Sequence, residues 1–367
     1  MTSNPFKDLL VIELASVLAG PSVGAFFSEL GARVIKIENK KTGGDVTRNW
    51  KGPSENSDQD FSAYWASVNL GKEVLLLDLM QAEDQQQVHE LIKQADVVLT
   101  NFKTTSAQKM KMDYGFLSAL NPKIIFAELT AFGESQSNRP AFDVVLQAEA
   151  GFLFMNGEPD RPPVKMPVAL IDILAGHQLK EAILIAMIQL MKTGQGTRLT
   201  VSLIDSAIAS LANQANNWLM ANHTPQRMGT LHPNIAPYGE MFTCADGKAI
   251  VLAIGTENHF QKLCMTLGLE ELVEDDRFAK NASRVKHRSE LKDILSVSIG
   301  GYQRDELLEL LHTQRVPVGS IKDMKEVFDI ETTNRMVLNG KLPDGKEGKR
   351  VKTVAFEIAD SAQSKTQ

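Results

Sequence analysis

A lone carboxylate in an apolar stretch is the first candidate for chemistry in this sequence. Asp172 lies in MPVALIDILAGHQ (Met166–Gln178), among Val, Ala, Leu and Ile side chains. The stretch has the pattern of an apolar strand followed by an apolar helix, where a charge is costly to dehydrate. Either Asp172 caps the N-terminus of the helix, or it is a reactive carboxylate. The residues of this stretch alone leave both interpretations open.

A basic loop is the second candidate. It follows the strand expected at Arg33–Glu38 and contains Lys40 and Arg48 together with two glycines. Phosphates tend to bind at the carboxyl ends of parallel strands. Lys103 and Lys109 follow another expected strand, and they would add positive charge to the same edge if the two strands are neighbours. The alternative is an ordinary solvated loop.

Other common sites are not supported by the motifs of this chain. The first predicted strand–helix turn contains Gly20 and Gly24 but lacks G-x-G-x-x-G, which argues against NAD. Cys244 and Cys264 have no metal-binding spacing, and neither H-E-x-x-H nor C-x-x-C occurs. We therefore expect no metal site and no dinucleotide.

Strands and helices alternate in the first part of the chain, which predicts an α/β fold with a Rossmann-like, mostly parallel sheet. A long apolar helix is expected after Asp172, to about Met191. The five strands expected first are Asp8–Leu14, Arg33–Glu38, Val74–Leu79, Val97–Phe102 and Ile124–Leu129.

The composition shift near His223 predicts two domains. A large domain is expected over residues 1–222, completed by about 328–367. A linker rich in Pro, Gly and His is expected over 223–240, and a smaller α+β domain over 241–327.

Composition limits the partners of the protein. The chain has 367 residues, 43% of them hydrophobic, and a formal charge of −6, so a nucleic-acid surface is not expected. The longest apolar run, Ala182–Met191, is too short to cross a bilayer, so we expect no membrane partner. Two cysteines without a disulfide pattern favour a cytoplasmic location.

Several long segments, in order, closely resemble the family III CoA-transferases, which include formyl-CoA transferase, carnitine CoA-transferase and the α-methylacyl-CoA racemases. The resemblance is dense over residues 9–206 and continues through HPNIAPYGEMFTCADGK and VPVGSIKDM. It rests on VIELASVLAGPSVGAFFSELGARVIKIENKKTGGDVTRNW, AFDVVLQAEAGFLFMNGEPDRPPVKMPVALIDILAGHQ and LMKTGQGTRLTVSLIDS.

The resemblance implies a fold, an activity and a nucleophile. Members have a Rossmann-like CoA-binding domain and a smaller domain, and they form interlocked homodimers. Asp172 matches the family's catalytic aspartate. It would carry CoA from an acyl-CoA to a carboxylic acid through a mixed anhydride and an aspartyl-CoA thioester. Coenzyme A is then a substrate thioester, and no cofactor is bound permanently.

The resemblance also implies CoA contacts, residue by residue. Four positions depart from the family pattern: Asn39 replaces a common Arg, Met80 a common Lys, Lys103–Thr105 a G-P-G segment, and Lys109 an Arg. Lysines could supply the charge but not the bidentate contacts of Arg. The positions expected to bind CoA are Val17, Leu18, Ala19, Lys40, Leu77, Asp78, Asn101, Phe102, Lys103 and Lys109.

Two alternatives stay open beside the transferase. The racemase branch needs a His base directly before the Asp of F-D-V-V-L-Q-A, but this chain has Phe142, which cannot move a proton. The other alternative is a catalytically weak CoA-binding protein, suggested by the four departures. The closing G-E-H-T-type segment of the family is also absent, so we expect a trimmed final layer in the large domain.

Overall fold

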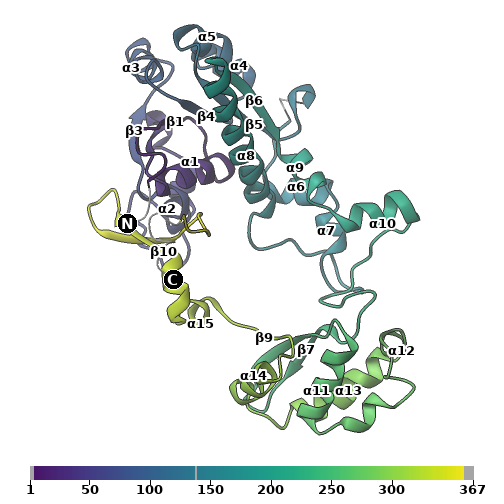
Figure 1. Cartoon of the computed structure of the whole chain (residues 1–367). Helices are drawn as coiled ribbons and strands as arrows, with labels where there is room; N and C mark the ends of the chain where they lie inside the picture. Colours follow the sequence, from purple (N-terminus) through teal and green to yellow (C-terminus); the bar gives the residue numbers. More distant parts are fainter. Residues whose placement is uncertain (1–3, 137–138, 359–367) are drawn as a thin grey trace, which may run out of the picture. The chain divides into compact units, whose positions relative to one another are not determined.

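The computed structural model describes residues 4–136 and 139–358, which form two compact units (Figure 1). The larger unit comprises the described parts of Met1–Phe152, Met166–His223 and Thr332–Gln367. The smaller unit comprises Leu153–Lys165 and Thr224–Glu331. In the part of the chain that the structure describes, no helix has both the length and the apolar character needed to span a membrane.

A six-stranded sheet organises the larger unit, and all of its pairings are parallel. The strand order is β3-β2-β1-β4-β5-β6, as in a doubly wound fold. The predicted parallel sheet is therefore confirmed, and the ends of the five strands expected first differ from the expected ones by at most two residues. The strands are β1 Leu10–Glu13, β2 Arg33–Asn39, β3 Glu73–Leu77, β4 Val97–Thr100, β5 Ile125–Thr130 and β6 Thr197–Ser202.

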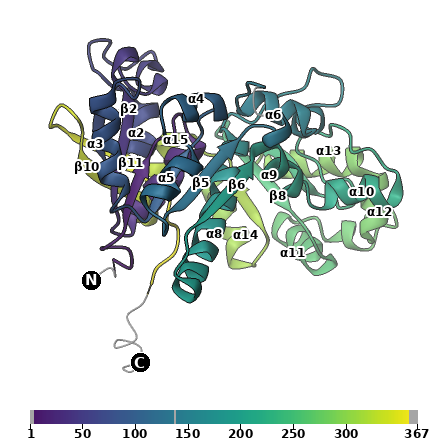
Figure 2. The ribbon, with the colours of Figure 1, turned by 90° about the horizontal axis from the view of Figure 1, so that it is seen from above.

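Helices cover both faces of this sheet, because alternate strand residues point to opposite sides (Figure 2). In β1, Val11 packs against α1 and α8, whereas Ile12 belongs to the opposite core, which α3 and α5 cover. The helices of this unit are α1 Ala19–Glu29, α2 Ala63–Asn69, α3 Ala82–Ile92, α4 Thr104–Lys109, α5 Tyr114–Leu120, α6 Asp143–Glu149, α8 Leu170–Thr193, α9 Leu203–Ala209 and α10 Asn213–Ala221.

The C-terminal part of the chain adds an antiparallel hairpin to the larger unit. Strands β10 (Val337–Lys341) and β11 (Glu347–Val351) pair with each other. Arg350 of β11 is buried, forms an ion pair with Glu29 and donates to the Leu70 carbonyl. The last residues expected to complete the large domain, 359–367, lie outside the described residues.

The smaller unit has its own apolar core, built on an antiparallel sheet ordered β7-β8-β9. Residues 153–165 also belong to it, since Arg227 donates to the Phe154 carbonyl at 3.0 Å. Helix α7 (Phe152–Met155) lies at the boundary between the units. The other elements are β7 Tyr238–Thr243, β8 Ala249–Ala253, β9 Val318–Ser320, α11 Glu257–Leu267, α12 Asn281–Lys286, α13 Arg288–Ile299, α14 Arg304–Thr313 and α15 Met324–Phe328.

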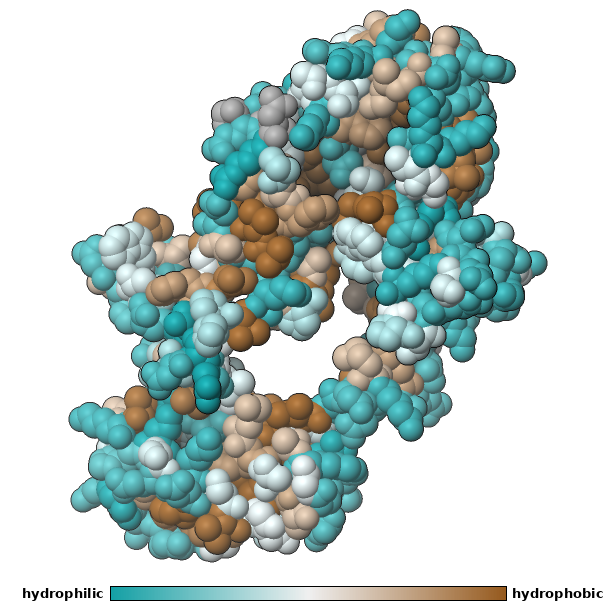
Figure 3. All heavy atoms as spheres, turned by 180° about the vertical axis from the view of Figure 1, so that it is seen from behind, coloured by the Kyte–Doolittle hydropathy of each residue, from teal (hydrophilic) through white to brown (hydrophobic). Residues whose placement is uncertain are grey.

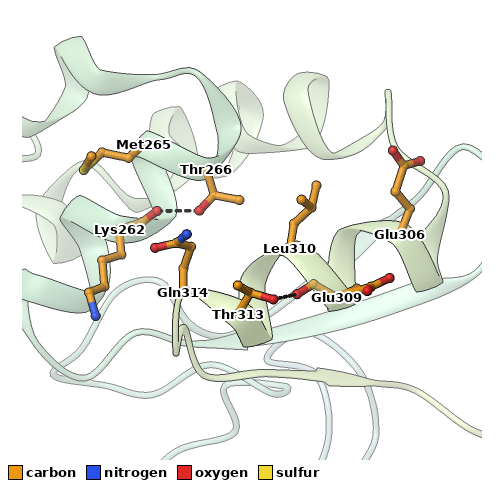
Figure 4. Close-up of a pocket in the computed structure, with 8 residues that line it drawn as sticks. All are labelled: Lys262, Met265, Thr266, Glu306, Glu309, Leu310, Thr313 and Gln314. Atoms are coloured by element: carbon orange, nitrogen blue, oxygen red, sulfur yellow. Dashed lines mark hydrogen bonds between the residues drawn. The ribbon is translucent and has the colours of Figure 1, made fainter.

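A shallow pocket of about 460 Å³ lies between α11 and α14 of the smaller unit (Figure 4). Its two hydroxyl groups are used by their own helices: Thr266 donates to the Lys262 carbonyl at 2.8 Å, and Thr313 to the Glu309 carbonyl at 2.9 Å. The other lining side chains are long, flexible or apolar. This pocket holds no buried reactive group, so the candidate site lies in the larger unit.

Candidate active site

Asp172 is the third residue of α8, which begins at Leu170. The N-cap position is Ala169, which makes no side-chain capping hydrogen bond, so the capping interpretation of Asp172 is wrong. The strand expected at the start of Met166–Gln178 is also wrong, because residues 166–169 form no strand and α8 begins at Leu170. Pro167 lacks the N–H group that a sheet ladder needs.

The carboxylate of Asp172 is buried, with 8% of the residue exposed. Burial, and secondly the charge of nearby Asp143, raises the pKa of Asp172 to about 7. No hydrogen bond from the described residues, helix N–H groups included, offsets the burial of this carboxylate. Asp143 itself accepts the Ile171 N–H at 2.7 Å and so ties α6 to the first turn of α8.

The pocket at Asp172 has a volume of about 400 Å³, and we call it the Asp172 pocket. It brings together the expected nucleophile and six of the ten positions expected to bind CoA. Glu128, Arg139 and Phe142 also line it. The six expected positions are Val17, Leu18, Ala19, Asn101, Phe102 and Lys103.

A second pocket of about 430 Å³ lies along the ends of β2, β3 and β4, and we call it the Asp78 pocket. Leu77, Asp78, Phe102 and Lys109 line it, as do the departing residues Asn39 and Met80. Lys40 lines neither pocket. Three residues line both pockets and therefore connect them: Ser16, Val46 and Phe102.

The turn before α1 forms one wall of the Asp172 pocket, and two side chains hold it. Val17 has a left-handed backbone, with φ of 72°, and its N–H donates to Asp45 at 3.1 Å. The Asn101 side chain accepts the Ser16 N–H at 3.2 Å and donates to the Ser16 carbonyl at 3.1 Å. In this structure Asn101 therefore positions the turn.

The predicted basic loop is only partly available to a phosphate. Asp45 and Arg48 are buried in a charge cluster with Glu13, Lys36 and Glu38. Lys36 lies 3.0 Å from Glu13 and 3.1 Å from Asp45. Arg48 lies 2.6 Å from Glu38. Within the loop, Lys40 remains exposed.

Three aromatic rings near the Asp172 pocket were not expected from the sequence. Trp50 packs edge-on against Tyr64, with ring centroids 5.0 Å apart, and against Phe142 at 6.2 Å. Burial, and then the charge of Asp172, raises the pKa of Tyr64 to about 12, so this phenol lies within the electrostatic reach of Asp172. The rings come from three distant segments, and no motif spacing could have grouped them.

Comparison with known proteins agrees with this geometry. The family model described as CoA-transferase family III matches residues 6–366. A succinate–glutarate CoA-transferase from Agrobacterium fabrum is 39% identical, over 88% of this chain and 82% of that protein. An acetyl-CoA:oxalate CoA-transferase from Acetobacter aceti is 33% identical, over 92% of this chain and 86% of that protein.

Solved structures give the same result. The crystal structure of a CAIB/BAIF family protein from Brucella suis superposes with a TM-score of 0.87 at 36% identity, covering 98% of this chain and 94% of that one. Fold, motif order and sequence identity therefore agree over nearly the whole chain. This protein is an enzyme that belongs to CoA-transferase family III.

Proposed function

We propose that this enzyme moves CoA from an acyl-CoA donor to an acceptor carboxylic acid through an aspartyl-CoA thioester on Asp172. The observation that carries the proposal is a buried carboxylate without a neutralising partner, in one pocket with six positions expected to bind CoA. Covalent catalysis needs a nucleophile that is held in place and is more reactive than in water. Burial at a fixed helix start supplies both properties to Asp172.

The reaction starts when an Asp172 oxygen attacks the thioester carbonyl of the donor. The C–S bond breaks, which gives a mixed anhydride and CoA thiolate. The thiolate then attacks the aspartyl carbonyl of the anhydride, the donor acid leaves as a carboxylate, and aspartyl-CoA remains. The acceptor carboxylate attacks this thioester, which releases the thiolate and forms a second mixed anhydride. The thiolate then attacks the acceptor acyl carbonyl of that anhydride, the new acyl-CoA forms, and Asp172 leaves as the free carboxylate. The thioester bond energy is conserved throughout, so no ATP is consumed.

The raised pKa of Asp172 sets the pH range of this chemistry. The attacking form is the carboxylate, which is the minor form when the pH lies below the Asp172 pKa of about 7. Desolvation makes that carboxylate a stronger nucleophile than one in water, at the cost of a smaller ionised fraction. Transfer should therefore accelerate as the pH rises through neutrality.

The two connected pockets suggest how CoA binds. We infer that the nucleotide part occupies the Asp78 pocket, near Lys109, and that the thioester end reaches Asp172 past Phe102. Lys40 and Lys103 would add positive charge for the phosphates from the ends of β2 and β4. Their single ammonium groups would hold phosphate less specifically than Arg does.

We propose dicarboxylic acids as substrates. The related proteins from Agrobacterium fabrum and Acetobacter aceti are named for succinate with glutarate and for oxalate. These acids share a second carboxylate, so succinyl-CoA is the first donor to test.

We also propose a homodimer of interlocked chains. Large apolar side chains are exposed on two helices of the larger unit, α8 and α10, where a partner chain could cover them. Apolar patches are also visible on the face of the molecule in Figure 3. Sedimentation should give about twice the mass of one chain. The exposed residues are Ile185, Ile188, Met191, Trp218, Leu219 and Met220.

A reducing cytoplasm fits the two cysteines. Cys244 and Cys264 are both free and buried, and burial raises the pKa of each thiol, that of Cys264 to about 12. Both thiols are therefore protonated and inert at neutral pH.

The test of the proposed function is to incubate the protein with succinyl-CoA and a panel of mono- and dicarboxylic acids, and to separate the acyl-CoA products. The expected result is a new acyl-CoA made from an acceptor, without ATP. Exchange of an α-proton with D₂O in the absence of acid transfer would instead indicate the racemase alternative. CoA binding without either reaction would indicate a binding protein.

A further inference from the structure

We propose that Arg139 binds the remote carboxylate of a dicarboxylic substrate and so determines selectivity against monocarboxylic acids. This inference rests on the proposed function and adds to it a specificity residue. Arg139 lies just before α6, in the segment that leads to Phe142, and it lines the Asp172 pocket.

The charges of the Asp172 pocket make Arg139 available to an anion. Lys103 and Arg139 are the cations among the lining residues, and Asp172 and Glu128 are the carboxylates. Glu128 is already paired with Arg198, whose Nη2 lies 2.7 Å from it. A dianionic substrate that places one carboxylate at Asp172 thus finds Arg139 or Lys103 for the other.

The positions of the two cations separate their roles. Lys103 directly follows Phe102, which lines both pockets, so Lys103 lies where the CoA path enters. Lys103 itself lines only the Asp172 pocket, but its neighbour Phe102 lines both, whereas residues 139–142 all line the Asp172 pocket and none lines the Asp78 pocket. Arg139 is therefore on the acyl side of the site, where the CoA phosphates are not expected.

The guanidinium of Arg139 is oriented but not fully used. It stacks over the Phe132 ring, with 3.9 Å between its central carbon and the ring centroid. Among the described residues, Glu149 is its one ion-pair partner, and both side chains are more than 40% exposed. A guanidinium has five N–H donors in a planar fork. Donors therefore remain for a carboxylate, which such a fork binds in bidentate geometry.

The test compares two acceptors of similar length, glutarate and valerate, with succinyl-CoA as donor. In a two-step transfer, kcat/KM for the acceptor reports the second half-reaction alone, so the donor does not affect the comparison. We expect Arg139→Gln to lower kcat/KM for glutarate by about 100-fold, the size typical of a lost charged hydrogen bond. If valerate is not turned over, its inhibition constant replaces kcat/KM. The kcat/KM for valerate and the Kd of CoA should each change by less than about threefold, because neither depends on a hydrogen bond to the remote carboxylate.

Two further variants complete the experiment. Arg139→Lys should recover part of the glutarate activity, because it restores the charge but not the fork. Arg33→Gln removes another exposed arginine of the larger unit, paired with Glu73, and should leave both acids unaffected. The inference is overturned by a wild type that does not prefer glutarate, by an equal loss for both acids, by an unchanged glutarate rate, or by a matching rise in the Kd of CoA. Absence of transfer in the wild type, from any donor, would instead remove the proposed function.

Discussion

Two buried aspartates of the larger unit, Asp45 and Asp172, have opposite electrostatic surroundings. They are similarly covered, with 5% and 8% of each residue exposed. Burial alone would raise the pKa of both carboxyls. At Asp45 this effect is outweighed by Lys36 and by hydrogen bonds from Thr47, and the pKa is lowered. At Asp172 nothing opposes burial, Asp143 adds to it, and the pKa rises to about 7.

The difference separates a structural charge from a reactive one. Asp45 belongs to a set of ion pairs that hold the Val17 turn, where a stable carboxylate is useful. Asp172 faces the pocket lined by that turn, where a compensating cation would lower its nucleophilicity. A buried charge without partners is expensive, and such charges cluster at functional sites. Variants at each site should therefore affect different properties.

The largest expected effect is on activity at Asp172. Asp172→Asn should lower the transfer rate by roughly 10⁴-fold or more, the scale seen when a covalent nucleophile is removed. The Kd of CoA should change little. Asp205→Asn is the matched control, since Asp205 is an exposed aspartate in the first turn of α9. Equal activity of the two variants, measured by acyl-CoA chromatography, would contradict the assignment of Asp172 as the reactive carboxylate.

The next effect is on stability at the charge cluster. Lys36→Met leaves buried Asp45 without its cation and leaves Glu13 with Lys72 alone, which should lower the free energy of unfolding by about 3–5 kcal/mol. Lys93→Met breaks an exposed pair with Glu90 and should cost less than about 1 kcal/mol. Urea denaturation measures the free energy of unfolding of both variants. Similar losses for the two lysines would show that the cluster does not carry structural charge.

The third effect is the pH dependence of stability, which is the smallest when it is counted per pH unit. Between an unfolded pKa of about 3.9 and the folded value of about 7, native Asp172 keeps a proton that the unfolded chain has lost. Its contribution to stability therefore decreases as the pH rises through this window. Within this window, the free energy of unfolding of Asp172→Asn should rise relative to that of the wild type by up to about 1.4 kcal/mol per pH unit. Above the folded pKa the difference between the two proteins should stay constant.

Asp45 should show the opposite sign. Its pKa is lowered in the folded state, so its contribution is present above the unfolded value and is lost as the pH falls through the folded value. Denaturation of the wild type and Asp172→Asn between the unfolded and folded pKa values of Asp172 tests the first statement. A constant difference between the two proteins would contradict the raised pKa of Asp172. For the second statement, the advantage of the wild type over Asp45→Asn should shrink as the pH falls below about 3.9.

The fold was largely predictable because its signal is local. Short apolar runs separated by amphipathic helices define parallel strands without knowledge of their partners. The same reasoning failed at residues 166–169, where the start of an apolar run was interpreted as a strand. Pro167 lacks the N–H that a sheet ladder needs, and the Met166 N–H instead donates to the Gln147 side chain at 2.9 Å.

The candidate site was predictable where family motifs matched it and not elsewhere. The motifs placed Asp172 and the turn at Val17 in one site, and the structure brings both to one pocket. Nothing in the sequence distinguished Lys36 from an ordinary residue of an apolar strand, because its partners Glu13 and Asp45 come from other segments. The role proposed for Arg139 likewise depends on its stacking over Phe132 and on its position in the Asp172 pocket. Contacts between distant segments leave no spacing to detect.

The most direct test of the central claim is the intact mass of the protein after incubation with succinyl-CoA, followed by hydroxylamine trapping and peptide mapping. The account predicts a CoA-sized adduct on the wild type that maps to Asp172, absent from Asp172→Asn and present on Asp205→Asn. CoA binding without an adduct, or an adduct that persists in Asp172→Asn, would contradict it.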